Sequence, residues 1–271
     1  MLPPTIYDSF WEHLENLPCT AVANGYRTIS ASSISTQNVD TPTAWIAENP
    51  SVLINLARSK LPTHPPSTGT LQQRMPQTEN THLLHTEGDV IRASLLYLLH
   101  PVNIAASRLL PAGRLYCRGE QSSGGGCRTD VRWVYHNGGQ MVNIAVLELK
   151  NTKVVHWGDF AHAMANEGNA KAMHDSAQDE PFQSHFKQNA VWLSKQARKY
   201  SVNVATDVAI FDWSAIFVFD FSGINEDALN PSLARGIWFS ESNSNPNHGH
   251  TFRIALLGFL IRALRRHNII S

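Results

Sequence analysis

The spacing of apolar residues predicts helices at both ends of the chain. Residues 1 to about 60 hold three short apolar segments between polar loops, "DSFWEHLENL", "PTAWIAENP" and "PSVLINLARSKL". The last two carry proline in the N-terminal turn, where a helix tolerates it. Near the other end, "TFRIALLGFLIRALRRH" repeats apolar residues at helical spacing behind Thr251, a helix-capping residue type. We therefore expect a helical N-terminal extension and an amphipathic helix that closes the chain.

The middle of the chain changes from helical to alternating periodicity. The segment "EGDVIRASLLYLLHPVNIAASRLL" has a helical apolar stripe, and Pro101 is expected to divide or kink that helix. A glycine-rich loop at Gly124 to Gly126 comes next. After it, "DVRWVY" and "MVNIAVLEL" stand on either side of a turn at Asn137 to Gly139, so we expect them to pair as a β-hairpin.

The order of the remaining segments completes an α/β pattern. We expect a helix in "FQSHFKQNAVWLSKQARKYSV" and two strands in "VATDVAIFDWSAIFVFDF", with Asp207, Asp212 and Asp220 as turn or edge residues. The sequence thus predicts three parts: a helical extension over residues 1–60, a linker rich in Pro, Ser and Thr over 61–80, and an α/β domain over 81–271.

The charge balance and the cysteine count of the chain limit the kinds of molecule and compartment that we expect for the protein. Lys plus Arg equal Asp plus Glu at 22 each, so any site for a polyanion must be a local patch. Three cysteines without a C-x-x-C pair are too few for a disulfide framework, which favours a reducing compartment. The N-terminus lacks the pattern of a signal peptide, and we expect an intracellular protein of the cytoplasm or nucleus with no membrane partner.

Charged residues end the second strand of the predicted hairpin. Because side chains alternate along a strand, one face is expected to carry Ile144, Val146, Glu148 and Lys150. Antiparallel pairing brings Asp130 beside Glu148, and two carboxylates on a sheet edge are ligands that Mg²⁺ accepts. A nearby ammonium could polarise a water or neutralise charge on a phosphate. The alternative is a structural ion pair, which contributes little if exposed.

These residues resemble the PD-(D/E)XK nuclease superfamily, and in particular its RecB-like branch and the nuclease-like proteins of fungal genomes. The pattern is an aspartate, then "LELK", then the Q-x-x-x-Y of "QARKY", in which Gln196 and Tyr200 lie one helical turn apart. Thr129 stands where the family often has proline. The resemblance covers about residues 81 to 222 and implies a restriction-endonuclease-like core, a mixed central β-sheet flanked by helices.

The resemblance also implies an activity and roles for named residues. It implies a nuclease that depends on Mg²⁺ or Mn²⁺ and hydrolyses phosphodiester bonds, with DNA as the expected nucleic acid. Asp130, Glu148 and the Leu149 carbonyl would hold the metal, and Lys150 would assist the attacking water. Gln196 and Tyr200 would position the substrate or support the metal site.

Three alternatives stay open at this point. Glu87 could face the metal, as a helical glutamate does in the family, or it could interact with the dipole of its own helix. The whole domain could be an inactive module that binds nucleic acid or protein, with the N-terminal helices as contacts for a protein partner. His248 and His250 suggest zinc, but because no cysteine pair or H-x-x-x-H accompanies them we expect a solvated loop.

Overall fold

The computed structural model describes residues 2–29, 41–79, 81–123, 127–179, 184–223, 233–242 and 245–271. The predicted glycine-rich loop at Gly124 to Gly126 lies outside them. The described part of the chain is an α/β protein with an eight-stranded mixed sheet and seven helices, counting the continuous segment Glu87–Ser107 as one helix.

One sheet runs through the molecule in the order β2-β3-β4-β6-β7-β8-β1-β5. Neighbours are parallel at β4–β6, β8–β1 and β1–β5 and antiparallel elsewhere. The predicted β3–β4 hairpin is confirmed, as are the two strands predicted around Asp212, which are β6 and β7 and pair with each other. The strands are β1 (Ala44–Ala47), β2 (Arg114–Ser123), β3 (Cys127–Asn137), β4 (Gln140–Leu149), β5 (Met164–Ala165), β6 (Asp207–Phe211), β7 (Ile216–Asp220) and β8 (Leu233–Phe239).

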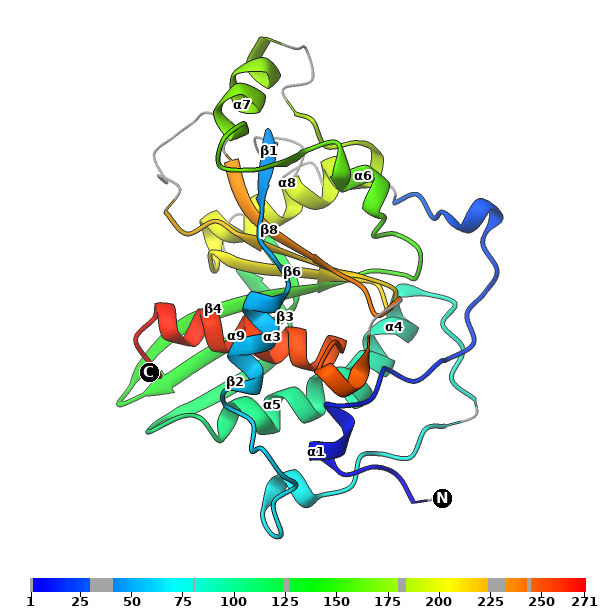
Figure 1. Cartoon of the computed structure of the whole chain (residues 1–271), viewed down its shortest axis with the longest axis vertical. Coiled ribbons are helices and arrows are strands. Elements are labelled where there is room, and N and C mark those ends of the chain that lie inside the picture. The colour runs from blue at the N-terminus through cyan, green and yellow to red at the C-terminus, as the bar shows by residue number, and fades with distance from the viewer. Residues whose placement is uncertain are drawn as a thin grey trace.

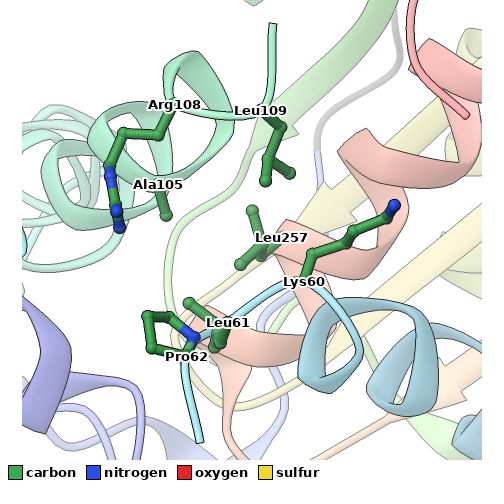
Figure 2. A pocket seen from close by; sticks show the side chains of 7 residues that line it. All are labelled: Lys60, Leu61, Pro62, Ala105, Arg108, Leu109 and Leu257. Carbon is green, nitrogen blue, oxygen red and sulfur yellow. The ribbon is translucent and has the colours of Figure 1, made fainter. Parts of the chain in front are cut away.

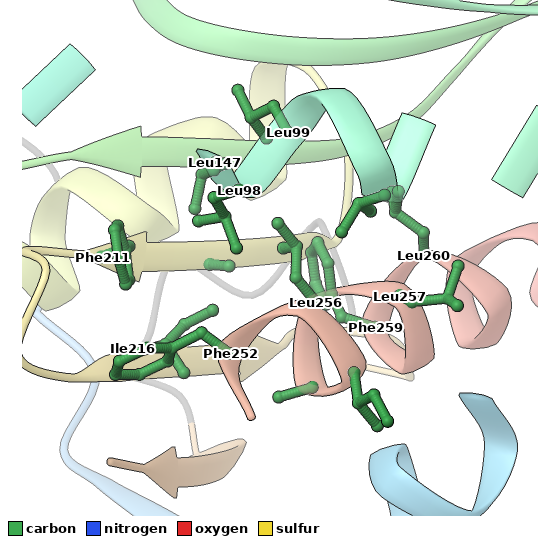
Figure 3. Close-up of a cluster of buried hydrophobic side chains, with 14 of the residues drawn as sticks. Leu98, Leu99, Leu147, Phe211, Ile216, Phe252, Leu256, Leu257, Phe259 and Leu260 are labelled. Atoms are coloured by element: carbon green, nitrogen blue, oxygen red, sulfur yellow. The ribbon is translucent and has the colours of Figure 1, made fainter. Parts of the chain in front are cut away.

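Helices cover both faces of this sheet (Figure 1). They are α1 (Ile6–Ser9), α3 (Ser51–Arg58), α4 (Glu87–Ser94), α5 (His100–Ser107), α6 (Trp157–Ala161), α7 (Ala170–Asp179), α8 (Gln188–Asn203) and α9 (Phe252–Arg266). Helices α6 and α8 pack on one face, whereas α3, α4, α5 and α9 pack on the other. Figure 3 shows how Leu147 and Phe211 of the sheet face Leu256 of α9, the predicted closing helix, which Thr251 caps.

Two parts of the predicted N-terminal extension fold differently from the prediction. The segment "PTAWIAENP" forms strand β1, not a helix, because it hydrogen-bonds between β8 and β5 and because the Trp45 indole N–H donates to the Phe160 carbonyl at 2.8 Å. The first helix covers only Ile6–Ser9. Beyond it, the carbonyls of Ser9 and Glu12 accept hydrogen bonds from the guanidinium of Arg253 on α9, at 3.0 and 3.2 Å, and the Ser9 carbonyl also accepts from the Glu12 backbone N–H at 3.3 Å.

The predicted linker is packed against the core, which corrects the expectation of a loose segment. Leu71 and Met75 are buried in the cluster that contains α1 and α9. The Met75 backbone N–H donates to the Pro4 carbonyl at 2.9 Å. Long-range apolar contacts therefore outweigh the local abundance of proline and polar residues. The division of the chain into an extension, a linker and a main domain as separate folding units stays a prediction.

Pro101 changes the helix as predicted, and the buried side chain of Arg253 binds a carbonyl that the proline leaves without its usual donor. Between α4 and α5 the chain forms a π-helical turn over Leu95–Leu99. Proline has no N–H to donate to the carbonyl four residues earlier, that of Tyr97. That carbonyl accepts from Nε of Arg253 at 2.6 Å, while the same guanidinium binds both carboxylate oxygens of Glu15 at 3.1 Å.

Replacing Arg253 by methionine is expected to lower the free energy of unfolding by about 3 to 5 kcal/mol, because several buried carbonyls and Glu15 lose their donor. Urea unfolding followed by circular dichroism measures the change. Arg92→Met, at an exposed position of α4, is the control and should stay within about 0.5 kcal/mol of the wild type. Equal stability of the two variants would contradict the role assigned to Arg253.

Two of the three aspartates predicted at turns or edges are buried ion-pair residues of central strands. Asp207 and Asp220 lie opposite each other on β6 and β7. Both pair with arginines of α9: Arg266 with the two aspartates, and Arg262 with Asp207 at 3.4 Å. Asp212 does occupy the predicted turn, where its carboxylate accepts four backbone N–H groups.

The face expected for Ile144 is also corrected. The pairing of β3 with β4 shifts register between Trp133 and Val134, whose partners are Ala145 and Asn143. Ile144 is therefore an extra residue, a β-bulge, and it packs in the cluster of the opposite face. Val146 lies on the α8 face.

The segment Glu87–Ser107 is long and apolar enough to cross a membrane by length and composition. More than half of its most apolar stretch is buried inside the protein. It is accordingly a core helix of the described fold.

Candidate active site

The candidate site lies where β4 ends beside β3 and α8. Val131 of β3 pairs with Leu147, so the next position along the ladder sets Asp130 opposite Glu148. Cross-strand partners project on the same face of a sheet, and both carboxylates therefore point to the face that α8 covers. Ala197 and other apolar residues of α8 are buried against this face, which fixes the rotation of the helix.

Glu148 is the centre of a hydrogen-bond network and is only 3% exposed. Its Oε1 accepts from Lys150 Nζ at 2.6 Å and from Gln196 Nε2 at 2.6 Å. The Tyr200 hydroxyl lies 2.7 Å from Oε2 and 2.9 Å from the Arg128 carbonyl, and its single proton serves one of them at a time. Gln196 also donates to that hydroxyl at 2.7 Å. The two helical residues therefore point into the site together.

Asp130 is tied to the neighbouring strand by a hydrogen bond. Its Oδ2 accepts from the Leu149 backbone N–H at 2.8 Å. Burial, and after it the charge of Glu148, raise the pKa of Asp130 to about 7. Excess negative charge of this kind favours a nearby cation.

Lys150 faces two glutamates. Burial alone would lower the pKa of Lys150, but the charges of Glu148 and Glu87 and the hydrogen bond to Glu148 raise it above its usual value. Its Nζ lies 3.8 Å from the Glu87 carboxylate. Lys150 therefore stays an ammonium at neutral pH, so it can donate a proton in a hydrogen bond or stabilise negative charge but cannot serve as a base.

The place of Glu87 is compatible with both roles left open for it. The capping box of α4 is formed by Thr86 and Asp89, so Glu87 is not the carboxylate that caps this helix. Its side chain is directed to the site, where burial and Glu148 raise its pKa and Lys150 lowers it. The structure thus brings Glu87 to the edge of the site beside Lys150, while its half-exposed carboxylate stays within the first turn of α4.

One contact at the site was not predicted from the sequence. Asn151 follows Lys150 and donates from Nδ2 to the His85 carbonyl at 3.0 Å, which ties the end of β4 to the residues before α4. Its backbone N–H also lowers the pKa of Glu87. An asparagine directly after a strand indicates that its side chain will bind a backbone group. The sequence could not indicate which group, because the partner lies 66 residues away in the chain.

Other features of the described residues lie apart from this site. A small pocket of about 80 Å³ between the ends of α3 and α5 and the side of α9 has Lys60 and Arg108 at its rim (Figure 2). His248 is exposed within a short 3₁₀ turn (Pro246–His248), as expected for a solvated loop, whereas His250 is half-buried. Within the described ranges, no group of three or more His, Cys, Asp or Glu side chains is arranged to hold a metal.

Comparisons of the chain with protein-family models, with curated proteins and with solved structures each found no match.

Proposed function

We propose that this protein is a metal-dependent nuclease that hydrolyses phosphodiester bonds, with DNA as the expected substrate. The main support is the hydrogen bonding of the Glu148 carboxylate at the end of β4. It accepts from Lys150, two residues further along the chain, and from Gln196 and Tyr200 of α8. The order of elements supports the finer proposal of a restriction-endonuclease-like core: the helix Glu87–Ser107, then the antiparallel strands β2, β3 and β4, then α8, then β6 parallel to β4.

The donor set fits a divalent cation such as Mg²⁺ or Mn²⁺. Mg²⁺ is bound in proteins by one or two carboxylates, with its other positions left to water and phosphate, and Asp130 and Glu148 share one face. The pKa of Asp130 is raised first by burial and then by the charge of Glu148, and a cation between the two carboxylates would offset both effects. Asp130, Glu148 and the Leu149 carbonyl would hold the ion. When bound, it would supply Lewis-acid activation of the phosphodiester and of water.

The protein's own residues supply the remaining chemistry. Lys150, held as an ammonium, stabilises the charge that grows on the phosphate in the transition state. Gln196 and Tyr200 hold the Glu148 carboxylate in one orientation, because each donates to a different oxygen of it. Glu87 adds a second acceptor that keeps Lys150 at the edge of the site.

A second candidate function is a nuclease fold that binds nucleic acid or protein without cleaving it. One observation favours it: Lys150 and Gln196 already fill both acceptor positions of Glu148 Oε1, so a metal can reach only Oε2 without displacing a hydrogen bond. A protein partner for the N-terminal helices and an intracellular location stay predictions.

A cleavage assay separates the two functions. The protein is incubated with single- and double-stranded DNA and RNA in Mg²⁺, in Mn²⁺ or in EDTA. We expect cleavage with either metal and none in EDTA. Absence of metal-dependent cleavage of all four substrates, by a protein that gives a cooperative melt, would contradict the nuclease and favour the binding module.

Asp130→Ala should weaken metal affinity rather than fold stability. The variant loses one of two carboxylate ligands and the hydrogen bond to Leu149. Its cleavage should fall at low Mn²⁺ and recover in part at high Mn²⁺, and calorimetric titration with Mn²⁺ should show the weaker binding. Asp175→Ala, an exposed carboxylate on α7, is the control. Unchanged Mn²⁺ affinity in Asp130→Ala would rule out Asp130 as a ligand.

A further inference from the structure

Arginine and aromatic side chains share one face of the β2–β3 ribbon. In its regular register Arg114 pairs with His136, Tyr116 with Val134 and Arg118 with Arg132. Since partners in a ladder project to the same side, one surface carries Arg114, Tyr116, Arg118, Arg132 and His136, which we call the arginine face. The opposite face of the ribbon packs into the core, through Leu115, Cys117, Val131, Trp133 and Tyr135.

The arginine face belongs to the same side of the sheet as the candidate active site. Asp130 precedes Arg132 by two positions on β3, so both side chains project from one face. From Asp130 to His136 the strand covers about 20 Å at 3.3 Å per residue. The row can therefore follow a nucleic acid backbone that enters the site.

Charge is concentrated here although the whole chain is neutral. Residues 114–147 contain four arginines against only Glu120 and Asp130, and α8, which covers this side of the sheet, has three basic residues and no acidic one. Arg118 and Arg132 are direct cross-strand partners. A polyanion bound across this pair would lie close to both guanidinium groups.

An aromatic group lies among these cations. Tyr116 is 37% exposed, and its ring lies 5.8 Å from the Arg118 guanidinium and 6.2 Å from the His136 ring. A shallow pocket of about 390 Å³ adjoins it, lined by Gly113, Arg114, Tyr116, His136, Asn137 and Gly138. Exposed aromatic rings between basic side chains are the elements on which unpaired bases stack in single-strand binding proteins.

We propose that the arginine face binds a single-stranded segment of the nucleic acid whose backbone continues into the candidate active site. Arg114 and Arg118 contact phosphates, and Tyr116 stacks on a base. The inference rests on the proposed function for one point, that the bound strand continues toward the candidate active site. Binding at the arginine face does not itself require cleavage.

The test measures binding without turnover. Fluorescence anisotropy of labelled single-stranded DNA, single-stranded RNA and duplex DNA is recorded in EDTA between about 50 and 200 mM salt. Tyr116→Ala should weaken single-strand binding about tenfold, and Tyr116→Phe should restore it because the ring is kept. The double variant Arg114→Gln with Arg118→Gln should weaken binding. It should also reduce the slope of the logarithm of the binding constant against the logarithm of the salt concentration, by about 0.7 for each phosphate contact that is lost.

Arg58→Gln with Arg108→Gln is the matched control, since it removes two exposed arginines from helices on the other side of the sheet. It should bind as the wild type does. The inference is overturned if the Tyr116 and Arg114/Arg118 variants, with wild-type melting curves, bind as tightly as the control, or if only duplex DNA binds. Binding through this face without cleavage in Mg²⁺ would instead overturn the proposed nuclease alone.

Discussion

Lys150→Ala is expected to reduce the rate of metal-dependent cleavage by about 10²- to 10³-fold, the loss typical of removing one group that stabilises charge in a transition state. The ammonium lies 2.6 Å from Glu148 and stays protonated, so its contribution is to the chemical step rather than to metal binding. Single-turnover cleavage measures the rate, and calorimetry with Mn²⁺ measures metal affinity, which should be largely kept.

The control for this variant is Lys171→Ala. Lys171 also pairs with a carboxylate, Asp175 at 2.8 Å, but in an exposed position of α7. It should cleave as the wild type does. Because Glu148 is buried, loss of Lys150 could also lower stability. Lys150→Gln keeps a donor and most of the side-chain volume. If Lys150→Ala melts early while Lys150→Gln melts normally and cleaves normally, Lys150 acts only as a structural hydrogen-bond donor, its charge is not needed for cleavage, and the assigned role is wrong.

Gly258→Ala is expected to lower the free energy of unfolding by about 3 kcal/mol or more. Gly258 lies on α9, where a Cβ would stand 2.0 Å from the Leu53 carbonyl oxygen and 2.5 Å from its carbon. These are backbone atoms of α3, so no rotamer change can relieve the overlap and one helix must move. The helix propensity that alanine adds, about 1 kcal/mol, is too small to offset this.

Gly158→Ala provides the matched comparison. Gly158 lies in α6, and a Cβ there meets no atom within 4 Å. That variant should be as stable as the wild type or slightly more stable. Urea unfolding of both variants gives the two changes. If Gly258→Ala unfolds at the wild-type urea concentration, α3 and α9 are not in close contact at this point.

The sequence predicted the strands in which apolar and polar residues alternate and the helices that carry a continuous stripe of apolar residues. It did not predict the elements that depend on partners far away in the chain. Strand β1 has four residues and exists because β8 and β5 hydrogen-bond to it. Likewise, Asp207 and Asp220 are buried because the arginines of α9 reach them from the far end of the chain. Local patterns carry no information about such pairs.

The sequence by itself determined the candidate site residues, because each belongs to a local pattern with a fixed geometry. Alternation along β4 sets Glu148 toward one face, and the spacing of Gln196 and Tyr200 sets them one turn apart on α8. Only the tertiary structure decided that these two patterns meet at one carboxylate, and that Glu87 joins them beside Lys150. It also decided the rotation of α8, since that depends on how its apolar side packs on the sheet, which is a property of two elements and not of one.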